Sequence, residues 1–92
     1  GCDPEAASGR RPVVLVADDY PENRRLLDLY LRERFDVLQA ATAEEALAVL
    51  RGQPVDLLVL DLNFCDGMSG VDAVRLLRAD PATAAVRVLA LT

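Results

Sequence analysis

The feature that most limits the fold of this 92-residue chain is the stretch 55–62, in which only Asp56 and Asp61 are polar. A strand this apolar has to be buried on both faces, as in the centre of a parallel sheet that helices cover. Two further apolar runs, Val13–Ala17 and residues 86–91, also predict strands, and a short strand is expected at Asp36–Ala40. Because 52% of the residues are hydrophobic and only 4% aromatic, we expect a small aliphatic core.

Segments with helical periodicity lie between these strands. Pro21 suits the first turn of a helix, Thr42 and Glu45 form a capping box that starts a second helix at Ala43, and Asp80 with Pro81 ends a third. The side chains expected to face inward are Leu26, Leu27, Tyr30 and Leu31, then Ala46, Leu47 and Leu50, then Val71, Val74, Leu76 and Leu77. The arginines of the first helix are expected on its solvated face: Arg24, Arg25, Arg32 and Arg34.

This alternation predicts one α/β domain over residues 13–92, with right-handed crossovers and helices on both faces of a parallel sheet. Residues 1–12 are polar and contain Pro, Gly and Ser, so we interpret them as a flexible tail or linker.

Charge and composition exclude several classes of function. The net charge is −5, all ten basic residues are Arg, and the chain has neither Lys nor His. An acidic chain without a basic run is a poor candidate for direct binding to nucleic acid. No apolar run approaches the length of a membrane span, so no membrane partner is expected. The two cysteines have no metal-site or disulfide spacing, which favours a reducing, cytoplasmic setting.

Polar residues follow three of the predicted strands directly. Asp18 and Asp19 come after the first, Asp61 follows the apolar residues 57–60, and Thr92 follows the last. In open α/β sheets the carboxyl ends of the strands form the edge where ligands bind. Carboxylates gathered there repel each other, and hard oxygen ligands suit Mg²⁺. The sequence therefore predicts a magnesium site at this edge.

These segments resemble the receiver domain of two-component response regulators. The resemblance rests on Asp18-Asp19 after the first strand, Asp61 in Leu-Val-Leu-Asp-Leu-Asn, Asp80-Pro81-Ala-Thr, and Leu91-Thr92, four matches in order at the family's spacing. It implies a flavodoxin-like, doubly wound parallel sheet, of which this chain would supply the order 2-1-3-4.

The resemblance also implies a chemistry. Asp61 would take a phosphoryl group from a phosphohistidine on a sensor histidine kinase or phosphotransfer protein. Asp18, Asp19, Asp61 and the backbone carbonyl of Asn63 would hold Mg²⁺, and the Thr92 hydroxyl would contact the phosphoryl group and switch an output domain or downstream protein. Such a domain is not an enzyme for an outside substrate, because it catalyses only its own phosphorylation and dephosphorylation.

The chain departs from the family pattern in two respects. Receivers usually carry a Lys at the end of a fifth strand, whereas this chain has no Lys and ends before the fifth strand and the last helices. We therefore expect a receiver that is incomplete at its C-terminus, with its fourth strand as an uncovered edge. Such a chain is expected to be marginally stable, or to form a homodimer or exchange elements between copies that cover this surface.

Two alternatives stay open. The missing Lys favours a degenerate receiver that acts as an interaction module without phosphorylation. A phosphatase of the haloacid dehalogenase type also uses a strand-end Asp and Mg²⁺, but it requires Asp-x-Asp after the first strand, where this chain has Asp18-Asp19-Tyr20-Pro21.

Overall fold

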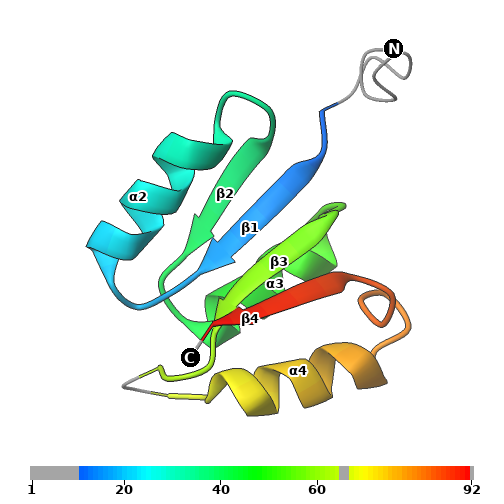
Figure 1. Cartoon of the computed structure of the whole chain (residues 1–92). Helices are drawn as coiled ribbons and strands as arrows, with labels where there is room; N and C mark the ends of the chain where they lie inside the picture. The colour runs from blue at the N-terminus through cyan, green and yellow to red at the C-terminus, as the bar shows by residue number, and fades with distance from the viewer. Residues whose placement is uncertain (1–10, 65–66, 92) are drawn as a thin grey trace.

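The computed structural model describes residues 11–64 and 67–91. Strands and helices alternate along them: β1 (Val13–Ala17), α2 (Pro21–Leu31), β2 (Asp36–Ala40), α3 (Ala43–Gly52), β3 (Leu57–Asp61), α4 (Gly70–Ala79) and β4 (Arg87–Leu91). The four strands form one parallel sheet in the order β2-β1-β3-β4 (Figure 1). The predicted α/β architecture and strand order are confirmed.

Two strands are shorter than the apolar runs that predicted them. The expected strand 55–62 narrows to Leu57–Asp61, and the expected strand 86–91 starts at Arg87. The Val86 N–H donates to the Thr83 carbonyl at 3.1 Å, so this residue closes a turn instead of joining the ladder. An apolar run reports burial, whereas a strand is defined by its hydrogen bonds, so the two boundaries differ by a residue or two.

Alternate residues of the strands build two separate cores. On one face, Leu15, Ala17, Leu58 and Leu60 pack with apolar residues of α3 and with Leu77 of α4. On the other face, Val14, Val16 and Val59 form a smaller cluster that Leu27, Leu31 and Phe35 cover. The sheet is therefore a middle layer, with α2 on one side and α3 and α4 on the other (Figure 1).

The predicted inner faces of the helices are confirmed for α3 and partly wrong for α2 and α4. Ala46, Leu47 and Leu50 are buried. In α2 only Leu27 and Leu31 pack on the sheet, whereas Leu26 is 51% and Tyr30 is 75% exposed. In α4 the same correction applies to Val71 and Leu76, which are exposed. A short helix contacts a flat sheet along one narrow stripe, so the flanking apolar residues stay in solvent.

Side-chain caps fix where α3 and α4 begin. The Thr42 hydroxyl accepts from the Glu45 N–H at 3.0 Å, and the Ser69 hydroxyl accepts from the Asp72 N–H at 3.1 Å. The N-cap role of Thr42 and the helix start at Ala43 are confirmed. The end of α4 at Ala79, before Asp80 and Pro81, is as predicted.

The folded part begins earlier than the predicted boundary at Val13. The Arg11 guanidinium donates to the carbonyls of Arg32 and Phe35 at 2.5 and 3.3 Å, and the Pro12 carbonyl accepts from the Asp36 N–H at 2.9 Å. These bonds tie both residues to the turn between α2 and β2. Residues 1–10 of the predicted tail lie outside the described part of the chain, so that interpretation stays a prediction.

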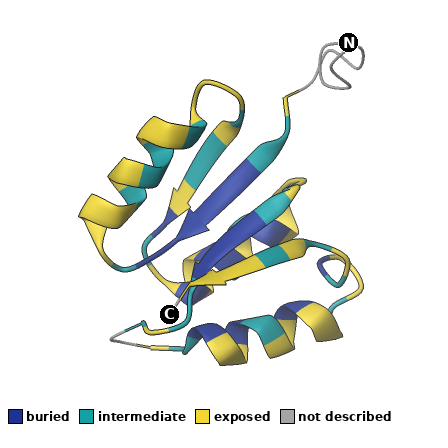
Figure 2. Ribbon diagram, viewed as in Figure 1, coloured by how far each residue is buried: buried dark blue, intermediate teal, exposed yellow. Residues whose placement is uncertain are grey.

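The outer strand β4 is the least covered part of the sheet. Four of its five residues are exposed, in contrast to the buried β1 (Figure 2). Leu89 is 53% and Leu91 is 38% exposed, so the expected uncovered edge is present. Across the described ranges 11–64 and 67–91, no helix is long and apolar enough to cross a bilayer.

Candidate functional site

The parallel pairing of β1 with β3 brings the predicted acidic residues together. Ala17 and Leu60 are register partners, so the residues that follow them, Asp18 and Asp61, leave the sheet side by side. One carboxylate oxygen from each of Asp18, Asp19 and Asp61 lies within 4.8 Å of the others. The structure therefore assembles the three carboxylates at the edge of the sheet where the sequence placed them.

Asp18 is only 4% exposed and is held by several hydrogen bonds. Its N–H donates to the Ala40 carbonyl at 3.1 Å, and its own carbonyl accepts from the Arg24 guanidinium at 2.7 Å. Its Oδ1 accepts from the Tyr20 N–H at 2.8 Å, and its Oδ2 accepts from the Asn23 amide at 3.2 Å. Both its backbone and its carboxylate are therefore fixed, mainly by the beginning of α2.

Asp61 is half-buried at the end of β3. Its Oδ1 accepts from the N–H of Asn63 at 2.9 Å, a bond from a carboxylate to the backbone two residues on that starts the following loop. The Leu62 N–H donates to the Leu91 carbonyl at 3.0 Å, which holds this strand end against β4. The position of Asp61 is thus set by the ladder on one side and by its own turn on the other.

Gly70 lets α4 start directly against Asp61. A Cβ at this position would lie 2.6 Å from both the Asp61 carbonyl oxygen and the Leu62 Cα. Such contacts with backbone atoms leave room only for a glycine. The close approach brings the beginning of α4 to the strand end that carries Asp61.

The far side of the loop is tied to α3. The Glu44 carboxylate accepts from the Met68 N–H at 3.2 Å, and a Cβ on Gly67, which has a φ of 74°, would meet the same carboxylate at 2.8 Å. The left-handed backbone of Gly67 favours glycine, whereas the neighbouring Glu44 carboxylate is the end of a flexible side chain. Glu44 thus fixes the return of the chain from Asp61 to α4.

The carboxylate cluster fits a hard divalent cation. Two oxygens bound to one Mg²⁺ lie at most about 4.2 Å apart, twice the usual metal–oxygen distance. The three oxygens here lie within 4.8 Å of one another, so a side-chain shift of under an ångström, or one bridging water, closes the difference. The donors that the described residues supply are all oxygen, and such donors suit Mg²⁺ and Ca²⁺.

A cleft of about 390 Å³ opens beside the carboxylates. It is lined by Asp18, Asp61, Asn23, Leu26, Leu27 and Leu91. Asn23 was not predicted as part of this site. The prediction that Arg24 lies on a solvated face is wrong, because its guanidinium donates to the Asp18 backbone carbonyl. Both lie in the first helical turn after an acidic strand end, and that position is the signal that could have identified them.

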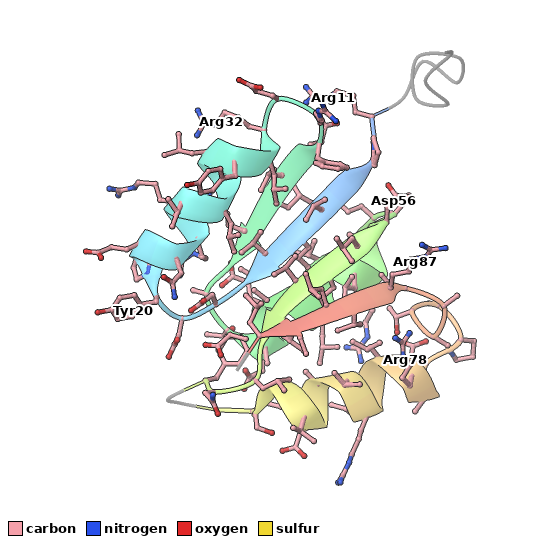
Figure 3. All side chains as sticks on the ribbon, viewed as in Figure 1. Arg11, Tyr20, Arg32, Asp56, Arg78 and Arg87 are labelled. Atoms are coloured by element: carbon pink, nitrogen blue, oxygen red, sulfur yellow. The ribbon has the colours of Figure 1, made fainter. Side chains whose placement is uncertain are left out.

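Asn63 and Thr92 are the two other residues that were predicted to belong to the site. Asn63 lies two residues beyond Asp61 and is exposed, and the role of its backbone carbonyl stays a prediction. Thr92 lies outside the described residues, but its neighbour Leu91 is the register partner of Asp61. Figure 3 shows the two ends of the sheet: Tyr20 lies just before the beginning of α2, whereas Asp56 and Arg87 lie at the opposite end.

Comparison of the sequence with known families gives a match over most of the chain. The family described as response regulator receiver domain matches residues 14–92. The transcriptional regulatory protein AruR of Pseudomonas aeruginosa is 47% identical over 73 residues, which are 73% of this chain and 30% of that protein. The DNA-binding response regulator MtrA of Mycolicibacterium smegmatis is 39% identical over 83 residues, 89% of this chain and 36% of that protein. The chain thus spans about a third of the length of these curated relatives.

Solved structures show the same fold. A response regulator receiver protein from Pseudomonas putida superimposes with a TM-score of 0.81 at 40% identity, over 88% of this chain and 67% of that one. The response regulator TrrA, solved in complex with the histidine kinase ThkA, has a TM-score of 0.78 at 30% identity, over 88% of this chain and 68% of the matched chain. Fold, strand order and family match agree, and the chain belongs to the response regulator receiver domains of two-component systems.

Proposed function

We propose that this domain accepts a phosphoryl group on Asp61 from the phosphohistidine of a sensor histidine kinase or phosphotransfer protein. In this proposal Mg²⁺ is held by Asp18, Asp19, Asp61 and the backbone carbonyl of Asn63. The observation that carries it is the gathering of three carboxylate oxygens within 4.8 Å at the edge of a receiver-type sheet. The complex between a related response regulator and a histidine kinase supports the nature of the partner.

The transfer step follows from the chemistry of the groups. An oxygen of Asp61 attacks the phosphorus, the P–N bond to the donor imidazole breaks, and its electron pair stays on the imidazole ring, which takes up a proton. The product is an acyl phosphate on Asp61. When bound, the divalent cation supplies positive charge that offsets the repulsion between the carboxylate and the phosphoryl oxygens.

The chain's own residues contribute orientation. The bond from the Asn63 N–H to Asp61 Oδ1 restricts the orientation of the nucleophilic carboxylate, and Gly70 lets the beginning of α4 lie directly against the Asp61 backbone. Thr92 follows the register partner of Asp61, so its hydroxyl is the group we assign to the phosphoryl oxygens. Through it, phosphorylation would change the contacts of an output domain or downstream protein in the cytoplasm.

The second candidate is a degenerate receiver that binds partners without phosphorylation. The observation that favours it is the absence of Lys from these 92 residues, because receivers usually place a Lys beside the phosphoryl group. An interaction module needs no metal, and it has no use for three mutually repelling carboxylates. The two candidates therefore differ in their need for Mg²⁺.

Calorimetric titration of the chain with MgCl₂ separates them. We expect binding at one site, and the substitution Asp19→Asn should weaken it about tenfold or more, because it removes a ligand charge. Glu33→Gln is the matched control: it makes the same change of charge at an exposed position near the other end of α2. Absence of Mg²⁺ binding by the parent chain would favour the degenerate receiver.

A further inference from the structure

We propose that Asn23 is a positioning residue of the acidic site, which orients the Asp18 carboxylate and thereby sets the affinity of the cluster for Mg²⁺. The inference rests on the proposed function and extends it to a residue of α2. Asn23 lines the same cleft as Asp18 and Asp61, although it belongs to neither strand end.

The contact geometry defines what Asn23 does. The Tyr20 N–H holds Asp18 Oδ1 at 2.8 Å, but one bond alone leaves the carboxylate free to turn about its Cβ–Cγ axis. The Asn23 amide donates to the second oxygen, Oδ2, at 3.2 Å and so fixes the plane of the group. Asp18 is 4% exposed, so little water reaches it to replace a lost donor.

The residue type at position 23 argues against a purely structural role of Asn23. Asn23 is the third residue of the helix and is exposed. Asn is a poorer helix former than Ala at such a position, so the helix gains no intrinsic stability from it. Its side chain carries no charge, so it affects a cation chiefly through the orientation of Asp18. Groups that orient a metal ligand in this way typically change metal affinity when they are removed.

The test is calorimetric titration with MgCl₂ of the full chain and three variants, combined with thermal unfolding in the absence of metal. For Asn23→Ala we expect the Kd for Mg²⁺ to rise about three- to tenfold. Removing a group that orients a metal ligand typically weakens metal binding about 10- to 100-fold, so the expected change is at or below the lower end of that range. Its Tm without metal should change little, because the lost bond to the Asp18 carboxylate is offset in part by the higher helix propensity of Ala. Asn23→Gln keeps an amide donor and should recover most of the affinity.

Leu29→Ala is the matched control, because Leu29 is an uncharged residue of the same helix and is 54% exposed. It should bind Mg²⁺ like the parent. A parent that binds Mg²⁺ together with an Asn23→Ala variant that binds equally or more tightly would overturn this inference and leave the proposed function intact. A lower Tm for Asn23→Ala with unchanged affinity would show a structural role and overturn it too. A parent that binds no Mg²⁺ would overturn both.

Discussion

At the scale of single residues, aspartates at the two ends of the same sheet do different work. Asp18 leaves β1 at its carboxyl end and joins the acidic cluster. Asp56 precedes β3 at the opposite end, where its Oδ2 accepts from the Val13 N–H at 2.7 Å and its own N–H donates to the Val13 carbonyl at 2.8 Å. Asp56 therefore extends the β1–β3 ladder by one pair of bonds, one of them made by a side chain.

This pairing gives a prediction for stability. Asp56→Ala should lower the free energy of unfolding by about 1 kcal/mol, because it leaves the Val13 N–H without its carboxylate partner. Asp56→Asn keeps an acceptor oxygen and should recover most of the loss. Urea unfolding followed by circular dichroism measures both, with Glu33→Ala as an exposed control. Equal stability of the Asp56→Ala variant and the parent would contradict this role.

The residues that sequence alone could predict are those whose position along a strand fixes their place. Asp18, Asp19 and Asp61 follow apolar runs, and parallel pairing necessarily brings such ends together. Asn23 and Arg24 could not be assigned in this way, because their contacts depend on how α2 is rotated about its axis. That rotation is set by the packing of Leu27 and Leu31 on the sheet. The sequence of the first helix does not show which of its apolar residues make this contact.

At the scale of elements, two glycines in helices have opposite meanings. Gly70 begins α4, and a Cβ there would lie 2.6 Å from backbone atoms of Asp61 and Leu62. Gly52 ends α3, and a Cβ there would meet nothing within 4 Å. Replacement by Ala therefore tests the close approach of α4 to β3 at Gly70, and helix propensity alone at Gly52.

We expect Gly70→Ala to lower the free energy of unfolding by about 1–3 kcal/mol, the usual range for overpacking a tight site. It should also slow phosphorylation, because α4 would have to move away from the strand end of Asp61. Gly52→Ala should raise the free energy of unfolding by about 0.5–1 kcal/mol, because Ala loses less backbone entropy in a helix. Chemical denaturation of the two variants beside the parent checks both signs. A neutral or stabilising Gly70→Ala would show that α4 and β3 separate easily.

Element positions were largely predictable because strong local signals coincide with them: Pro21, the Thr42 cap, and Asp80 before Pro81. The buried faces of the helices were less predictable than their positions along the chain. The apolar residues Leu26, Tyr30 and Val71 fit the helical period, yet they lie beside the narrow stripe that touches the sheet. The local sequence shows the helical spacing of the apolar residues. How many of them are buried depends on the shape of the sheet surface on which the helix packs.

At the scale of the whole molecule, the sheet of the described residues has a buried centre and an open edge at β4. The centre of the sheet, β1 and β3, is buried, whereas β4 presents exposed leucines and an unpaired outer edge (Figure 2). An exposed apolar edge strand is a ready template for pairing with another chain. The predicted homodimer stays a prediction, and this edge is where we expect it to form.

Sedimentation velocity over a range of concentrations measures this association. We expect the parent chain to associate reversibly, and Leu89→Lys to weaken the association by placing a charge on the edge strand. Leu29→Lys is the matched control, since Leu29 is 54% and Leu89 is 53% exposed, but Leu29 lies on α2. Association that is absent in the parent, or reduced equally by both variants, would contradict a role of β4.

The fold as a whole followed from the sequence because burial, alternation and crossover handedness leave few arrangements for such a chain. The extent to which β4 is covered is a property of the surroundings of the sheet, and the apolar run 86–91 carries no information about it. The exposure of β4 agrees with the uncovered edge that was expected of the fourth strand.

The central claim is that Asp61 is the phosphoacceptor. The most direct test is the intact mass of the chain after incubation with Mg²⁺ and a small phosphodonor such as acetyl phosphate, with Asp61→Asn treated in parallel. We predict a gain of one phosphoryl group on the parent, loss of this gain in Asp61→Asn, and no gain in the parent when EDTA removes the metal. An unmodified parent, or equal modification of the parent and Asp61→Asn, would contradict the claim.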